Sequence, residues 1–272
     1  MKNKFDESDE IESSSAPLIE HLSELRSRLI WCLSAFVVCM IGVFPFSNHV
    51  FNFLANPIVE LLAMQERPTE LIFTGMQQGF MVNVKISLFG GFILAFPFIG
   101  FQLWKFVAPG LYKKEKMAFL PFLLASPILF FIGSAFAFYI VLPLAFDFFL
   151  SFQNSNDVND LVGISYLGTI NEYLGLTMKF ILAFGICFQL PVLLTLMGKA
   201  GLVSSHFLSG FRKYSMVSIL IVSALVTPPD VITQLILFSV VYSLYELSIL
   251  LVKMVEKKRE KKLDEMDKEN LS

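Results

Sequence analysis

Ionisable side chains, the groups that could carry protons or ions, are scarce in the apolar segments of this sequence. A proton or ion path through a membrane needs Asp, Glu or His at mid-depth. The acidic residues of the long apolar runs instead lie near the ends of those runs: Asp147, Glu172, Asp230 and Glu246. Gln189 is the one strongly polar side chain near the middle of a run, and a hydrogen bond between helices explains it. This scarcity argues against a secondary transporter.

Two further acidic residues stand in basic surroundings. Glu115 lies among lysines in segment 104–117, WKFVAPGLYKKEKM, where an acid adds nothing to membrane topology. A weak surface pairing with a neighbouring lysine is one explanation. Glu24 lies in segment 17–29, PLIEHLSELRSRL, whose leucines recur at helical spacing with charged residues between them. An interfacial helix that leads into a membrane span explains this pattern, so the residues alone assign neither acid a ligand.

Residues that could bind a metal or act as a nucleophile form no recognisable pattern. The histidines are scattered, and the cysteines lie in apolar runs at spacings that fit neither a zinc site nor a redox pair (His21, His49, His206; Cys32, Cys39, Cys187). No nucleotide-binding motif or catalytic triad appears, which predicts a protein that is not an enzyme and uses no cofactor or metal. The formal net charge of −2 gives no argument for a nucleic-acid partner.

The composition indicates that these residues are positioned by membrane helices. Apolar residues make up 55% of the 272 residues and charged residues 16%, against roughly a quarter charged in a soluble domain. Six apolar runs have the length and composition of spans, and strand-like alternation is absent from them. They cover approximately residues 29–46, 80–106, 117–149, 173–197, 214–226 and 231–251. The predicted fold is an all-α polytopic membrane protein with six transmembrane helices.

Lysine and arginine are distributed unevenly between the two ends of these predicted helices. Eighteen of the 21 lie in the N-terminal segment, in loops 104–117 and 197–213, or after Leu251. Of the three others, Arg67 lies on the opposite side, and Lys85 and Lys179 lie inside the spans or near their ends. Basic residues accumulate on the cytoplasmic side of membrane proteins. Both termini are therefore predicted to be cytoplasmic.

The chain divides into a disordered, acidic cytoplasmic tail over 1–16, a membrane domain over 17–252 and a charged cytoplasmic tail over 253–272. The first tail lacks the apolar stretch of a cleavable signal peptide. Prolines inside the spans remove backbone hydrogen bonds and bend helices, which favours a curved bundle (Pro97, Pro121, Pro127, Pro143, Pro191). The fifth span, of about 14 residues, reaches only about 21 Å across a hydrocarbon core of about 30 Å. This shortness predicts local thinning of the bilayer or shielding by neighbouring helices.

Motifs spread along the chain resemble those of one known family. HLSELRSRL at 21–29 is similar to its N-terminal signature, and FQLWKFVAPGLYKKEK at 101–116 is similar to its first internal loop. Other segments resemble its first external loop, third span, fourth span and fifth-to-sixth turn: ANPI at 55–58, FYIVLPLAF at 138–146, AFGICFQLPV at 183–192 and TPPDVITQ at 227–234. The matches follow the family's order over roughly residues 17–251. The family is TatC, the multispanning core of the twin-arginine protein translocase.

The resemblance implies a receptor and scaffold that binds signal peptides with two consecutive arginines and helps to export folded proteins, driven by the proton-motive force. The acids of the family's recognition site map onto Glu24 and Glu115, and Arg26 and Phe106 match positions expected to hold that site together. A guanidinium offers a planar fork that a carboxylate accepts bidentately, whereas an ammonium is a point charge. Two carboxylates therefore give a physical route to preferring Arg-Arg over Lys-Lys. The surrounding lysines would repel other cationic segments.

Four more positions bear on the resemblance. Pro57, Asp230 and Gln234 match the family and are expected to serve structure or partner contacts, although an N-cap alone would explain Asp230. Gln189 departs from the family, because many members carry Glu there. A neutral amide can hydrogen-bond a neighbouring helix but cannot hold a proton or a charge, which puts any role of ionisation at this position in doubt.

The implied partners are TatA- and TatB-like single-span subunits packed along the fifth and sixth spans, twin-arginine signal peptides and membrane lipids, with several copies in each complex. The implied location is the bacterial cytoplasmic membrane. The alternative function is a small-solute or ion transporter. That alternative predicts buried ionisable residues around a site at mid-depth, which the sequence lacks.

Overall fold

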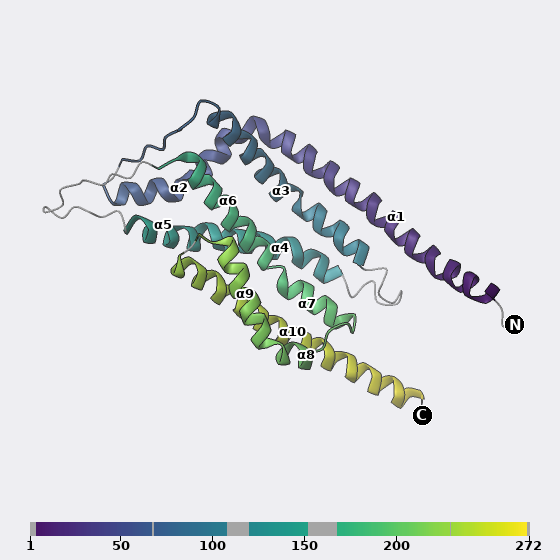
Figure 1. The fold of residues 1–272 in the computed structure, drawn as a ribbon. Coiled ribbons are helices and arrows are strands. Elements are labelled where there is room, and N and C mark those ends of the chain that lie inside the picture. Colours follow the sequence, from purple (N-terminus) through teal and green to yellow (C-terminus); the bar gives the residue numbers. More distant parts are fainter. Residues whose placement is uncertain (1–3, 67, 108–119, 152–167, 229, 271–272) are drawn as a thin grey trace.

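Helices make up nearly all of the described part of the chain in the computed structural model, which covers residues 4–66, 68–107, 120–151, 168–228 and 230–270 (Figure 1). Within these ranges the only β-type pairing is an isolated parallel bridge between Ile72 and Thr169. In chain order the elements are α1 (Lys4–Val43), η1 (Phe44–Phe46), α2 (Ser47–Met64), α3 (Gln78–Val107), α4 (Leu120–Phe136), η4 (Ala137–Val141), α5 (Leu142–Ser151), α6 (Ile170–Cys187), α7 (Leu190–Lys199), α8 (Ser205–Gly210), α9 (Arg212–Val226) and α10 (Val231–Asn270). The all-α prediction is confirmed.

Five helical stretches among the described residues are long and apolar enough to cross a membrane: Leu22–Met64, Gln78–Leu103, Phe122–Ser151, Ile170–Lys199 and Val231–Lys261. The remaining predicted span, the fifth, corresponds to α9, which has only 15 residues and so rises about 22 Å. Most side chains of α9 are exposed, and Ser223 is its one buried residue. The chain is therefore a multispanning membrane protein whose fifth span is the short one, as its sequence predicts.

The first and last helices are longer than the predicted spans. Residues 4–16, for which the composition predicts a disordered tail, form the first part of α1, and the charged segment after residue 252 continues α10 as far as Asn270. α10 contains no glycine or proline, so a helix that the membrane stabilises meets no breaker as it leaves the bilayer. In α1, residues 18–41 likewise contain neither, and Pro17 lies where residues 4–16 join them. η1, with Pro45 inside it, follows the end of α1.

The helices pack as a row. α1 contacts α3 at one edge, α4 contacts α3 and α6 in the middle, and α10 contacts α7 and α9 at the other edge. Figure 1 shows both termini at the same end of the bundle, on the two outermost helices, as the even number of predicted spans requires. A buried cluster from α2, α3, η4, α5, α6 and α10, including Ile86, Val141 and Phe184, joins the helices in the half of the bundle away from the two termini (Figure 1).

Glycines allow two of these helix pairs to approach closely. A Cβ at Gly185 of α6 would lie 2.6 Å from the ring of Phe130 and 2.7 Å from the hydroxyl of Ser134, both on α4. A Cβ at Gly133 of α4 would lie 2.7 Å from the carbonyl oxygen of Phe184 on α6. The same constraint applies between α1 and α3, where a Cβ at Gly91 would meet the backbone of Met40 at 2.7 Å. Small residues at crossings are the usual means of packing helices in lipid, where van der Waals contact drives association.

Prolines disturb the helices at several points. Pro57, Pro97 and Pro127 lie inside α2, α3 and α4. Before Pro143 the backbone widens into a π turn, in which the N–H of Leu142 donates to the carbonyl of Ala137. Pro191 follows the break between α6 and α7, where the N–H of Gln189 donates to Ile186 instead of a carbonyl four residues back. The predicted bends at Pro143 and Pro191 thus correspond to local changes of helix type.

Replacing Gly185 by alanine is expected to lower the free energy of unfolding by about 1–3 kcal/mol, because the added Cβ must displace Phe130 or separate the two helices. Gly175→Ala on the same helix is the matched control, since a Cβ there meets nothing within 4 Å. That control is expected to be neutral or more stable by up to about 1 kcal/mol through helix propensity. Thermal unfolding in detergent measures both. Equal stability of the two variants would contradict the close α4–α6 crossing.

Candidate functional site

Glu24 lies on α1 and is held by an arginine one turn later on the same helix. Nε of Arg28 donates to Oε1 of Glu24 at 3.0 Å, and Nη2 of Arg28 donates to the same oxygen. Nη1 of Arg28 reaches across to α3, where it donates to Oε1 of Gln102 at 3.1 Å. Arg28 therefore joins the predicted receptor carboxylate to a second helix.

Of the predicted site residues, Glu24 takes part in these hydrogen bonds, and Arg26 and Phe106 lie on the same two helices. Arg26 is exposed, and the arginine that pairs with Glu24 is Arg28. Phe106 is half-buried one turn after Gln102 on α3, so it lies at the same end of the α1–α3 pair. Glu115 lies outside the described residues, and its place in a two-carboxylate site stays a prediction. Sequence reasoning missed Arg28 and Gln102, although the Glu24–Arg28 spacing is a standard helical ion pair.

Gln189 makes the hydrogen bonds between helices that its position predicts. The hydroxyl of Ser126 on α4 donates to Oε1 of Gln189 at 2.7 Å, and Nε2 of Gln189 donates back to the carbonyl of Ser126 at 3.0 Å. Both the acceptor and the donor of the amide are thus used on one residue of the facing helix. This reciprocal pair needs a neutral amide.

Asp230 caps the start of α10. One of its carboxylate oxygens accepts the backbone N–H of Thr233 at 2.7 Å, and the other accepts the hydroxyl of Thr233. Gln234, one turn later, donates from Nε2 to the carbonyl of Leu220 on α9 at 3.5 Å. The N-cap explanation of Asp230 is therefore confirmed, and Gln234 links the two helices of the short pair.

A second arginine–glutamate pair joins the start of α9 to the middle of α10. Nε and Nη2 of Arg212 donate to Oε1 and Oε2 of Glu246 at 2.8 and 2.9 Å, and the hydroxyl of Tyr242 donates to Oε1 at 2.9 Å. The pair lies at the first residue of α9 and 16 residues along α10 from Asp230, so α9 and the part of α10 beside it are about 22–24 Å long.

Pro57 lies in the middle of α2, in the segment that resembles the family's first external loop. This segment is helical, because α2 runs through 55–58 from Ser47 to Met64. The missing N–H of Pro57 and its ring weaken the bonds of the preceding turn. Close to it, the hydroxyl of Tyr173 on α6 donates to the carbonyl of Leu54. This contact between α2 and α6 therefore lies within one turn of the proline.

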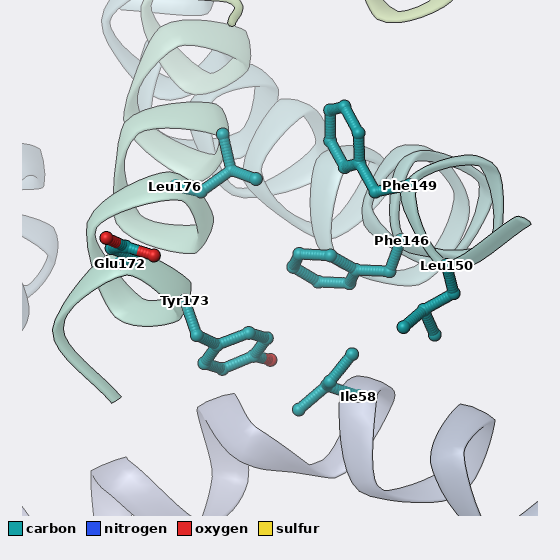
Figure 2. A pocket seen from close by; sticks show the side chains of 7 residues that line it. All are labelled: Ile58, Phe146, Phe149, Leu150, Glu172, Tyr173 and Leu176. Carbon is teal, nitrogen blue, oxygen red and sulfur yellow. The ribbon is translucent and has the colours of Figure 1, made fainter. Parts of the chain in front are cut away.

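A small cavity of about 130 Å³ lies beside this contact, at the end of the bundle opposite to Glu24. Its lining comes from α2, α5 and α6: Ile58, Phe146, Phe149, Leu150, Glu172, Tyr173 and Leu176. Figure 2 shows the side chains of Phe146, Tyr173 and Ile58 converging, with Glu172 at the edge. The cavity offers apolar contact and a single exposed carboxylate, which suits packing and supplies no acid–base pair. In the described part of the chain, His, Cys, Asp and Glu form no group of three able to hold a metal ion.

Comparison with known proteins decides the family. Residues 20–239 match the family described as Sec-independent protein translocase protein (TatC). The chain belongs to the TatC family. It is accordingly a multispanning translocase subunit of the receptor type, and not an enzyme.

Individual relatives align with this chain over most of its length. The Sec-independent protein translocase protein TatC of Magnetococcus marinus is 45% identical over 244 residues, which are 90% of this chain and 86% of the relative. The corresponding protein of Aquifex aeolicus is 40% identical over 89% of this chain and 97% of its own length. A crystal structure of the twin arginine translocase receptor TatC superposes with a TM-score of 0.74 at 39% identity, covering 87% of this chain and 99% of that one. The fold described above is thus the fold of this family.

The reciprocal bonds between Gln189 and Ser126 predict a specific pattern of stabilities. Gln189→Leu removes both bonds and is expected to lower the free energy of unfolding by about 1 kcal/mol, the scale of side-chain hydrogen bonds between membrane helices. Ser126→Ala removes only the bond from the hydroxyl and should cost less. In the Ser126→Ala background the effect of Gln189→Leu should shrink, because one of its two bonds is already absent. Additive effects in thermal unfolding would show that the two side chains are independent.

Proposed function

We propose that this chain binds twin-arginine signal peptides at its cytoplasmic face through Glu24 and Glu115, and thereby selects folded proteins for export. The observation that carries the proposal is the position of Glu24. Its side chain keeps 36% of its surface exposed while Arg28 and Gln102 hold it between α1 and α3. A charged acceptor that is fixed and still accessible suits recognition of a guanidinium. The internal loop that carries Glu115 directly follows α3, and Gln102 near the end of α3 lies beside the Glu24–Arg28 pair, so we expect both acids at the same end of the α1–α3 pair.

The other edge of the row, formed by α9 and α10, is where we expect the partners that support export to bind. We expect single-span subunits of the TatA and TatB type to pack along α9 and α10. On α9, Val217, Ile221 and Leu225 are exposed at successive turns and form an apolar stripe available to lipid or to another helix. The short α9–α10 pair would thin the bilayer locally. Several copies per complex, use of the proton-motive force and the bacterial cytoplasmic membrane as the location complete the proposal.

The two carboxylates are testable separately. Glu24→Ala and Glu115→Ala are each expected to weaken binding of an Arg-Arg signal peptide by about 1–3 kcal/mol, or about 5- to 150-fold, because each removes a charge-assisted hydrogen-bonding partner. Glu60→Ala is the control, since Glu60 is an exposed acid on α2 at the opposite end. Crosslinking and equilibrium binding with Arg-Arg and Lys-Lys peptides give the measurement. Unchanged binding of the Arg-Arg peptide to both variants would refute the site.

The proposed orientation predicts the outcome of reporter fusions. A fluorescent protein joined after Ser272 should fluoresce and an alkaline phosphatase there should be inactive, because both termini are placed in the cytoplasm. The same phosphatase joined at Asn159, between α5 and α6, should be active. An active phosphatase at the C-terminus would reverse the orientation and with it the assignment of Glu24 to the cytoplasmic face.

A further inference from the structure

The Glu24–Arg28 pair is asymmetric in its burial. The side chain of Arg28 keeps 15% of its surface exposed, whereas that of Glu24 keeps 36%. The guanidinium thus lies on the inner side, between α1 and α3, and the carboxylate lies nearer the rim. An ordinary exposed pair at this spacing contributes little, because both side chains remain mobile. Here the partner on α3 adds a third attachment point, Gln102, 74 residues away in the chain.

The bonds of Arg28 also determine how the carboxylate is turned. Nε and Nη2 both donate to Oε1 of Glu24, and Nη1 donates to Gln102. A planar guanidinium that is fixed at three nitrogens constrains the direction of the carboxylate that it binds. Lysine in its place would supply charge from one nitrogen and leave that direction unconstrained. The carboxylate of Glu24 therefore has an orientation that its own helix would not impose.

We infer that Arg28 is a positioning residue of the receptor site, which orients Glu24 so that its exposed side meets the planar fork of an arginine in the signal peptide. This inference rests on the proposed function of Glu24. Its consequence is specific: Arg28 supports discrimination between Arg-Arg and Lys-Lys more than binding as such. A point charge such as an ammonium gains little from a fixed carboxylate plane, whereas a fork depends on it. The positive charge of Arg28 also lowers the attraction of the pair for any cation, so the preference must come from geometry.

Arg28→Lys in the full-length chain tests the inference, since it keeps the positive charge beside Glu24 and loses the fork. Binding of a labelled Arg-Arg peptide is expected to weaken about 3- to 10-fold, the effect of losing roughly one hydrogen bond, while binding of the Lys-Lys peptide changes less than about twofold. Gln102→Leu, which removes the attachment on α3, should act in the same direction with a smaller effect. If Arg28→Lys fails to fold, Gln102→Leu carries the test.

Arg212→Lys is the matched control, because it makes the same change in the bidentate pair with Glu246 on α9 and α10, at the other edge of the row. It should leave the ratio of the two affinities unchanged. An equal loss of affinity for both peptides in the Arg28→Lys protein would show that Arg28 only stabilises the scaffold, and this would overturn the inference. A gain in affinity for both peptides would show that Arg28 competes with the ligand, which also overturns it.

The Glu24→Ala variant measured in parallel separates the two levels of the argument. If Glu24→Ala weakens binding of the Arg-Arg peptide and Arg28→Lys leaves the preference for Arg-Arg over Lys-Lys unchanged, the proposed site is supported and the positioning role of Arg28 is refuted. If Glu24→Ala has no effect, the proposed function of Glu24 fails first, and the role of Arg28 fails with it.

Discussion

Backbone hydrogen bonding in the absence of water is the constraint on which this structure depends. In the hydrocarbon core every N–H and C=O must find its partner within the protein, and this chain interrupts its helices with prolines. A π turn precedes Pro143, and a tightened turn precedes Pro191. Near Pro57 a carbonyl of α2 accepts the hydroxyl of Tyr173 from α6. The bends that shape the bundle are thus accompanied by contacts between helices.

The same constraint accounts for polar residues in the described part of the spans, which bond to a neighbouring helix or cap a helix end. Gln189 and Ser126 satisfy each other, and Asp230 caps α10. Chemistry that needs an accessible charge is therefore found at the helix ends. Of the two arginine–glutamate pairs in the described residues, Arg212–Glu246 uses both carboxylate oxygens in one fork, whereas Arg28 bonds a single oxygen of Glu24. The first geometry clamps α9 to α10, whereas the second pair is joined to α3 through the bond of Arg28 to Gln102.

The sequence predicted the all-α class, the short fifth span and the N-cap at Asp230, because long apolar runs and capping spacings are local signals. It did not predict the helix through 55–58, since a proline inside an apolar segment is equally typical of a loop. It also missed the contact of Arg28 with Gln102. The partner on α1 follows from spacing along one helix, but the partner on α3 depends on how the two helices cross, which Gly91 permits and no local pattern encodes.

Gln189 joins two helices inside the membrane without introducing a charge. Its amide both accepts from and donates to Ser126, and a carboxylate could not make the second of these bonds without holding a proton. A charge at this depth would also have to be neutralised within the membrane. The reciprocal pair therefore ties α4 to the break before Pro191 without an ionisable group. In the proposed function, selection of a cationic ligand falls to acids outside the spans, and Glu24 is held there because α1 and α3 cross closely enough for Arg28 to reach both.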